Sequence, residues 1–248
     1  MFTLTLKGCG RPIVMLHGWG HSHQSLRPLA DLLVEETQPI LFDLPGFGQS
    51  ERPQMTWSAA EYADAIVKQL DKLNIEKFLL LGHSFGGKVA ICLAERYSER
   101  VDRLILISSS GLKEARSLDR QFKFSLKKLF SKAIKSIDRL FRKNYFEIYF
   151  VPKFASSDYK SFPKIRDILV RSVNEDLSHI LPKINTPSLI LWGEKDTQTP
   201  LKMGIQMAKL IPNAIFYSFF QHDHDLPHDD AGAQLSAMYI LRFLRGGS

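Results

Sequence analysis

Cysteine is scarce in this chain: of its 248 residues, only Cys9 and Cys92 are cysteines. Two cysteines exclude a framework of disulfides and a metal site built mainly from thiolates, and they fit a reducing compartment, so we expect a cytoplasmic location. Long apolar runs are lacking as well. No stretch approaches the roughly 20 residues that a membrane-spanning helix needs, and the first residues do not resemble a signal peptide. We therefore expect no membrane span.

Internal repeats and low-complexity tracts are also lacking. A hydrophobic content of 44% in a chain of this length allows one large domain with a buried core, or such a domain with a small insertion. The formal net charge is +7, but it is unevenly spread. Residues 112–183 hold 17 Lys and Arg against 8 Asp and Glu, a net +9, which leaves −2 for the remainder. The basic character therefore belongs to one segment.

Short apolar runs alternate with segments of helical length. Buried parallel strands read as continuous apolar runs because helices cover both of their faces. The runs are 13–18, 39–44, 78–83, 101–108, 187–193 and 214–219. Between the second and third runs, Ser58 followed by Glu61 is a capping box that predicts the start of a helix. The pattern predicts an α/β protein with a mostly parallel central sheet and helices on both faces.

Residues 112–183 break this alternation, since they contain no convincing buried strand. Apolar residues there recur at helical spacing, which predicts a long amphipathic helix: Leu126, Leu129, Phe130, Ala133, Ile134, Ile137, Leu140 and Phe141. We interpret 112–183 as an inserted helical subdomain, a cap, with 1–111 and 184–248 forming the α/β core.

Gly82-His83-Ser84-Phe85-Gly86 has the pattern Gly-x-Ser-x-Gly and lies between a predicted strand and a predicted helix. This is the context of a nucleophile elbow, in which glycines let the backbone turn sharply beneath an exposed hydroxyl. The following helix would aim its free N–H groups and the positive end of its dipole at the site. We predict Ser84 as a nucleophile, rather than a bystander in a glycine-rich turn.

A serine hydroxyl needs a base beside it, and the base needs an orienting acid. Both are expected after later strands. Asp196, on the loop after 187–193, is the predicted acid, with Glu194 as the alternative. The loop after 214–219 offers three candidates for the base, His222, His224 and His228.

The same ten residues, Gln221–Asp230, also contain four aspartates and could suggest a metal site. Pro227 breaks the strand alternation that would align His222 with His224, and no second cluster with suggestive spacing supplies further ligands. We therefore expect no metal here.

The strand 13–18 ends in His17-Gly18-Trp19-Gly20. In this architecture an early loop donates one backbone N–H to the oxyanion, and the residue after the nucleophile donates the other. The expected donors are Trp19 and Phe85, while His17 is interpreted as a structural residue that hydrogen-bonds the loop.

Several motifs together resemble the α/β-hydrolase superfamily, in the order Ser, acid, His: HGWG at 17–20, DLPGFGQS at 43–50, GHSFGG at 82–87, LISSSG at 106–111 and LPKINTPSLILWGEKDTQTP at 181–200. The resemblance implies an eight-stranded sheet with a cap inserted after the sixth strand. Only sixteen residues precede His17, so we expect the family's first strands to be shortened or missing. By resemblance to the family's spacing and His-x-x-Pro phrasing, His224 is the predicted base.

Within the superfamily, the motifs resemble serine carboxylesterases, including the pimeloyl-carrier-protein methyl ester esterases. This implies a hydrolase that cleaves a carboxylic ester or thioester through an acyl-enzyme and needs no cofactor. The chain is also similar to hydrolases that cleave carbon–carbon bonds in ring-fission dienones. Ser84 argues against the dehalogenase and epoxide hydrolase branches, which have Asp at this position. A non-catalytic binding module stays the remote alternative.

The basic segment has two interpretations. Its lysines could form the solvated face of an amphipathic helix, or they could steer an acidic acyl carrier protein, or another anionic substrate, towards Ser84. A small acyl ester is the expected substrate in either case. No segment resembles a module that reads nucleic acid, so we expect no nucleic-acid partner.

Overall fold

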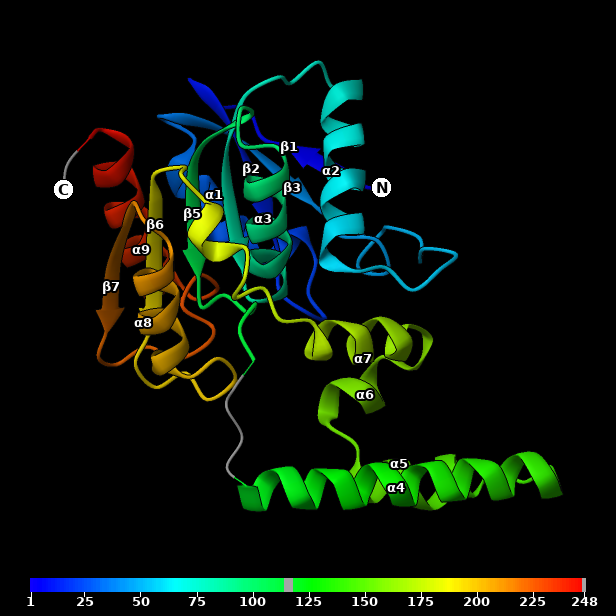
Figure 1. Cartoon of the computed structure of the whole chain (residues 1–248). Coiled ribbons are helices and arrows are strands. Elements are labelled where there is room, and N and C mark those ends of the chain that lie inside the picture. The colour runs from blue at the N-terminus through cyan, green and yellow to red at the C-terminus, as the bar shows by residue number, and fades with distance from the viewer. Residues whose placement is uncertain (114–117, 247–248) are drawn as a thin grey trace. The chain divides into compact units, whose positions relative to one another are not determined.

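The computed structural model describes residues 1–113 and 118–246, except the side chains of 118–128. Its seven strands form one sheet (Figure 1) in the order β1-β3-β2-β4-β5-β6-β7. Their bounds are β1 Thr3–Thr5, β2 Arg11–Leu16, β3 Thr37–Phe42, β4 Phe78–His83, β5 Val101–Ile107, β6 Ser188–Gly193 and β7 Ala214–Phe219. Only β1 runs antiparallel to its neighbour β3, and all other pairs are parallel. The α/β class and all six predicted strands are confirmed.

The resemblance implies eight strands, with the family's first strands expected to be shortened or missing, and the described residues form seven. Only the three residues of β1 precede β2 as a strand, so one of the family's early strands is absent from the described sheet. The insertion consequently follows the fifth strand of the chain, β5, rather than the sixth.

Helices flank the strands in the chain: α1 Arg27–Leu33, α2 Ala59–Lys72, α3 Phe85–Arg96, α4 Leu118–Phe141, α5 Val151–Phe154, α6 Ser157–Ser161, α7 Arg166–Asn174, α8 Leu201–Leu210 and α9 Asp230–Leu244. Helix α2 begins as its sequence predicts. The Ser58 hydroxyl accepts from the Glu61 amide, and the Glu61 carboxylate accepts from the Ser58 amide at 2.7 Å. Two N–H groups that the helix cannot pair internally are thereby satisfied.

Each face of the sheet is covered by helices. Every second residue points to the same side, and one side packs against α1 and α9. This cluster contains Ile13, Met15, Leu79, Leu81, Ile105, Ile107, Leu189 and Leu191 from the strands, with Leu29, Leu33, Ile240 and Phe243 from the two helices. The intervening residues, such as Val14 and Leu80, are equally buried on the side where α3 contacts the sheet. Because both faces are covered, the strands carry no alternation of polar residues.

The chain forms two compact units, Met1–Leu112 with Arg171–Ser248, and Lys113–Val170. The sequence placed the end of the insertion at 183, but the residues after 170 belong to the first unit, where Leu177 donates from its amide to Gly111 O at 2.8 Å. Among the described residues, no helix is both long and apolar enough to cross a membrane.

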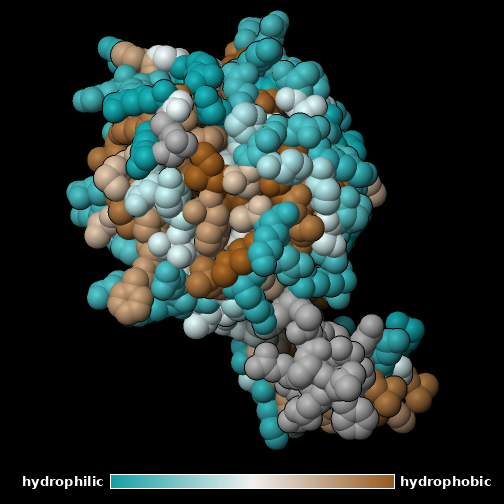
Figure 2. All heavy atoms as spheres, turned by 60° about the vertical axis from the view of Figure 1, so that its left-hand side comes forward, coloured by the Kyte–Doolittle hydropathy of each residue, from teal (hydrophilic) through white to brown (hydrophobic). Residues whose placement is uncertain are grey.

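In the smaller unit the predicted amphipathic helix is present as α4, although Leu126 lies outside the described side chains. Several residues of its apolar stripe are largely exposed, among them Leu129, Phe130, Ile137, Leu140 and Phe141. In Figure 2, brown spheres on this unit mark hydrophobic residues at its surface. Phe146 is buried and stacks on the half-buried Phe150, with ring centroids 5.0 Å apart, and the aliphatic Val151 and Ile165 are buried as well.

The capping box of α2 gives a stability prediction. Replacing Ser58 with Ala leaves the Glu61 amide without its acceptor, so we expect the free energy of unfolding to fall by about 1 kcal/mol. Urea unfolding followed by circular dichroism measures the change. Ser58→Thr, which keeps the hydroxyl that accepts from the Glu61 amide and donates to the Glu61 carboxylate, is the control, and an equal loss in both variants would contradict the cap as the cause.

Candidate active site

Ser84 lies in a sharp turn between β4 and α3. Its backbone is held at φ 51° and ψ −114°, a conformation that is costly for a residue with a side chain. The turn is possible because its neighbours lack side chains. A Cβ on Gly86 would lie 2.2 Å from Leu16 O, and one on Gly82 would lie 2.5 Å from Gly86 O. The strand, strained serine and helix together have the form of a nucleophile elbow.

Hydrogen bonds to the backbone of Ser84 hold this turn in place. Its amide donates to Ile107 O at 3.1 Å, at the end of the neighbouring strand β5. Its carbonyl accepts from both the amide and the hydroxyl of Ser110, at 3.0 and 3.1 Å. The backbone groups of Ser84 are thereby paired, and its side chain is half-buried.

The structure brings three of the predicted site residues into one chain of hydrogen bonds. The Ser84 hydroxyl lies 2.9 Å from His224 Nε2, and His224 Nδ1 lies 2.8 Å from Asp196 Oδ2. Since an ionised carboxylate only accepts, Nδ1 carries the proton and Nε2 is free to accept one from Ser84. Both His224 and Asp196 are buried, with 6% and 5% of their surface exposed.

The Asp196 carboxylate is held ionised by its surroundings. Burial alone would raise its pKa, but hydrogen bonds from His224 and Thr199 outweigh burial and hold the pKa below its usual value. Oδ1 accepts from the amides of Gln198 and Thr199, both at 2.8 Å, and the Thr199 hydroxyl lies 2.7 Å from Oδ2. These three contacts fix the orientation of the carboxylate towards His224.

The alternative bases and the alternative acid make other contacts than those of the Ser84 site. His228 Nδ1 is 3.1 Å from Asp225, and burial followed by the charge of nearby His21 lowers its pKa to about 4. His222 packs its ring edge against Phe219. Glu194, the alternative acid, accepts from the Ser218 hydroxyl at 2.7 Å. Of the candidates weighed from the sequence, His224 and Asp196 are the ones joined to Ser84.

The predicted oxyanion donors lie on two elements that meet at Ser84. Phe85 is the first residue of α3, where an N–H has no acceptor within the helix. Trp19 follows Gly18, whose position is so close to the elbow that a Cβ there would lie 3.3 Å from Ser84 Cβ. The Trp19 and Phe85 rings meet edge to face with centroids 5.4 Å apart, which packs the loop against the helix.

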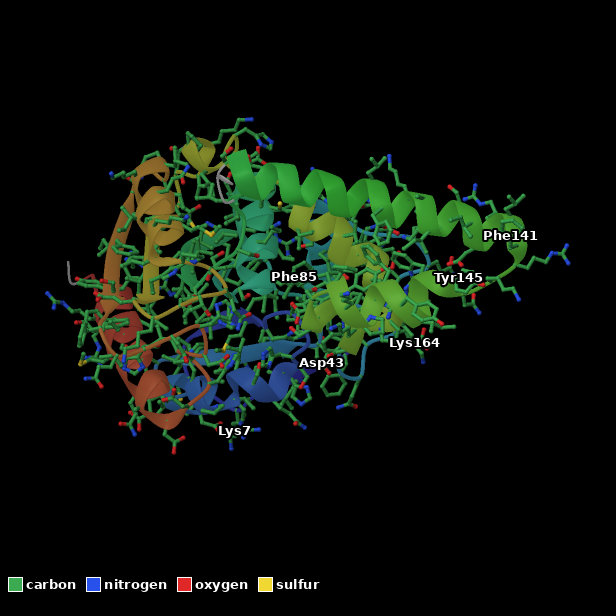
Figure 3. All side chains as sticks on the ribbon, turned by 90° about the horizontal axis from the view of Figure 1, so that it is seen from below. Lys7, Asp43, Phe85, Phe141, Tyr145 and Lys164 are labelled. Carbon is green, nitrogen blue, oxygen red and sulfur yellow. The ribbon has the colours of Figure 1, made fainter. Side chains whose placement is uncertain are left out.

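Two buried histidines anchor the loop that carries Trp19. His17 Nδ1 donates to Gly18 O at 2.7 Å and its Nε2 accepts from the Leu44 amide at 3.0 Å, so both nitrogens serve the backbone. Burial lowers the pKa of His17 to about 4, which keeps it neutral. At the far end of the loop, the amide and Nδ1 of His23 bond Asp43 Oδ1 at 2.6 and 2.8 Å. In Figure 3 the labelled Asp43 lies just after β3 and Phe85 at the start of α3.

Sequence reasoning missed two residues that touch the base and the acid. Thr199 contacts the Asp196 carboxylate, as described above, and its hydroxyl also lies 3.3 Å from His224 Nδ1. His83 is fully buried, and its Nε2 donates to the backbone carbonyl of His224 at 2.9 Å. Burial is the main cause that lowers the pKa of His83, so its ring stays neutral. The Asp-x-x-Thr pattern at 196–199 could have signalled the first contact, but nothing local signals the second.

Comparisons with known proteins identify the family of the chain. The model of the alpha/beta hydrolase fold family matches residues 11–231. The chain is 27% identical to YugF, an uncharacterized hydrolase from Bacillus subtilis, over 94% of this chain and 89% of that one. It is 26% identical to a 2-hydroxy-6-oxononadienedioate/2-hydroxy-6-oxononatrienedioate hydrolase from Pseudomonas putida, over 86% of this chain and 81% of that one.

Among solved structures, a thermophilic esterase from Thermogutta terrifontis superposes with a TM-score of 0.73 at 22% identity, covering 98% of this chain and 93% of that one. At this identity the likeness concerns the fold. The family model, in contrast, spans β2 to the start of α9 and thus includes the elbow and both later loops. The chain belongs to the alpha/beta hydrolase fold family.

Proposed function

We propose that this hydrolase is a serine carboxylesterase that cleaves a carboxylic ester or thioester through an acyl-enzyme. The observation that carries the proposal is the continuous contact from the Ser84 hydroxyl through His224 to Asp196, at 2.9 and 2.8 Å. These distances are those required of a nucleophile, its base and the group that orients the base. The reaction so formulated needs no cofactor.

In the first half-reaction, Ser84 Oγ attacks the carbonyl carbon of the ester while its proton passes to His224 Nε2. The carbonyl oxygen becomes an oxyanion, which the amides of Phe85 and Trp19 stabilise, each by about 3 kcal/mol if aligned as in other hydrolases of this kind. The tetrahedral intermediate then collapses. The bond to the alcohol or thiol breaks, and the leaving group takes the proton from Nε2.

In the second half-reaction, water attacks the acyl-enzyme. Its proton passes to His224 Nε2, a second oxyanion forms in the same place, and the acid leaves as Ser84 Oγ regains the proton. Throughout both halves, the negative carboxylate of Asp196 stabilises the imidazolium at a distance of 2.8 Å from Nδ1. The hydrogen bond from His83 to the His224 carbonyl supports the base from its backbone side.

The nucleophile is tested by Ser84→Ala. Loss of the hydroxyl removes the covalent step, so we expect kcat for a p-nitrophenyl ester to fall by at least about 10³-fold. A fluorophosphonate probe should label the unmodified chain at Ser84, as detected by peptide mass spectrometry. Ser136→Ala, a change on the exposed face of α4, should keep both rate and labelling. An active Ser84→Ala enzyme would end the proposal.

The base is tested by comparing three histidines in one loop. Only His224 contacts Ser84, so His224→Ala should lower kcat by about 10³-fold or more, whereas His222→Ala and His228→Ala should retain the rate within about tenfold. Steady-state rates with one ester, together with circular dichroism of each variant, make the comparison. A nearly normal rate in His224→Ala, combined with a large loss in His228→Ala, would assign the base to His228 instead.

A second candidate is hydrolysis of a carbon–carbon bond in a ring-fission dienone. It is favoured by the likeness to the Pseudomonas putida hydrolase, whose name describes such a dienedioate substrate. The two reactions share the nucleophile, base and acid, so contacts around Ser84 do not separate them.

An activity panel distinguishes the two candidates. We expect turnover of short and long acyl esters and thioesters to exceed turnover of a ring-fission dienone in kcat/KM by at least about tenfold, measured by product chromatography with Ser84→Ala as the blank. The panel includes a methyl ester carried on an acidic acyl carrier protein, because the insertion is basic. Preference for the dienone would replace the esterase proposal by the second candidate.

A further inference from the structure

A cluster of three side chains beside the catalytic residues takes no part in the proposed reaction. His21, Asp225 and His228 each offer one ligand atom, and these atoms lie within 4.8 Å of one another. His21 belongs to the loop after β2, and the other two belong to the loop between β7 and α9. We propose that these residues bind a divalent transition-metal ion of the zinc class, which would tie the two loops together.

The distances suit such an ion. Zinc binds imidazole nitrogen and carboxylate oxygen at about 2.0–2.2 Å in tetrahedral geometry, which places neighbouring ligand atoms roughly 3.3 Å apart. Asp225 Oδ1 and His228 Nδ1 are already 3.1 Å apart, and the ring centroids of His21 and His228 are 4.7 Å apart. The Asp225 side chain is 57% exposed, so a rotation of its carboxylate towards the histidines meets little packing.

The state of His228 points to a ligand. Its Nε2 is buried and has no hydrogen-bond partner among the residues that the structure describes. If Nδ1 donates to Asp225, the lone pair of Nε2 stays unpaired in the interior. If the proton is on Nε2, the lone pair of Nδ1 faces a carboxylate instead. A cation between Nδ1 and Asp225 makes ligands of both groups and keeps the proton on Nε2. That proton then lies beside the ring of His83, 4.6 Å away between centroids, whose Nδ1 is a buried acceptor likewise without a partner among the described residues.

The chemistry of the three groups selects the class of ion. Two imidazoles and one carboxylate suit zinc, copper or nickel, whereas magnesium and calcium prefer sites made of oxygen. Three protein ligands leave a fourth tetrahedral position, which water or an anion would fill.

The position of the cluster gives binding a consequence for the site. Trp19, the predicted oxyanion donor, lies two residues before His21, and His224 directly precedes Asp225. An ion held by both loops would restrain them relative to each other. Binding itself does not depend on the proposed esterase activity, since it is measured without substrate.

The test uses the full chain, freed of metals by a chelator and then titrated with ZnCl₂ in calorimetry. We expect one strong site, and a rise of about 5 to 10 °C in the unfolding midpoint when zinc is at roughly 100 times its Kd. Removing a group that only orients a ligand costs about 10–100-fold in metal affinity, so His21→Ala, Asp225→Asn and His228→Ala should each weaken binding by at least about tenfold.

Two matched controls are His222→Ala and His224→Ala, which lie in the same loop but outside the cluster and should bind zinc like the unmodified chain. Absence of a strong site in the unmodified chain would overturn the inference. It would also be overturned if His224→Ala lost zinc binding while the three cluster variants kept it, because the ion would then be bound by the catalytic base. In either case the activity tests of Ser84 would be unaffected.

Discussion

The start of α3 lies against the end of β2 so closely that Gly86 has no room for a side chain, and the rest of the site depends on this contact. It places the loop after β2 beside Ser84, so that the predicted oxyanion donors come from two elements that are already packed together. It also sets the tight turn that forces Ser84 to a positive φ. The strain at Ser84 is balanced by the hydrogen bonds that its amide and carbonyl make with β5 and the segment after it. The nucleophile is therefore positioned by backbone packing before any side chain orients it.

Much of the fold and of the nucleophile elbow could be predicted from the sequence, because each of these features is encoded by residues that are neighbours in the chain. Continuous apolar runs predict the parallel strands, and the pair Ser58 and Glu61 predicts the start of α2. The elbow was predictable because strand, glycines, serine and helix are consecutive. Asp196 is preferred to Glu194 from its place on the loop after 187–193, whereas His224 requires the family's spacing, since local pattern alone leaves His222 and His228 open. The alpha/beta hydrolase fold is confirmed, while the catalytic roles stay predictions that the distances support.

What sequence could not supply are contacts between distant segments. The bond from His83 to the His224 carbonyl joins residues 141 positions apart, and both ends look unremarkable in isolation. The stretch 221–230 is a second example of a contact between distant segments. Its sequence neighbours include no second cluster of metal-binding residues, so the sequence predicts no metal site there. Folding adds His21, some 200 residues earlier in the chain, to Asp225 and His228. The sheet has seven strands where the family has eight, because only β1 precedes β2, in line with the expectation that the family's first strands are shortened or missing.

Lys88 shows how the chain returns to the first unit after its insertion. It is almost fully buried one turn after Ser84, and its ammonium donates to the carbonyls of Ser172 and Glu175 at 2.5 and 3.1 Å. Glu175 in turn accepts from the Ala59 amide at the start of α2. These contacts, all within the first unit, hold the re-entry point. The anchor of the returning chain is therefore carried by the same helix, α3, that begins at the nucleophile elbow.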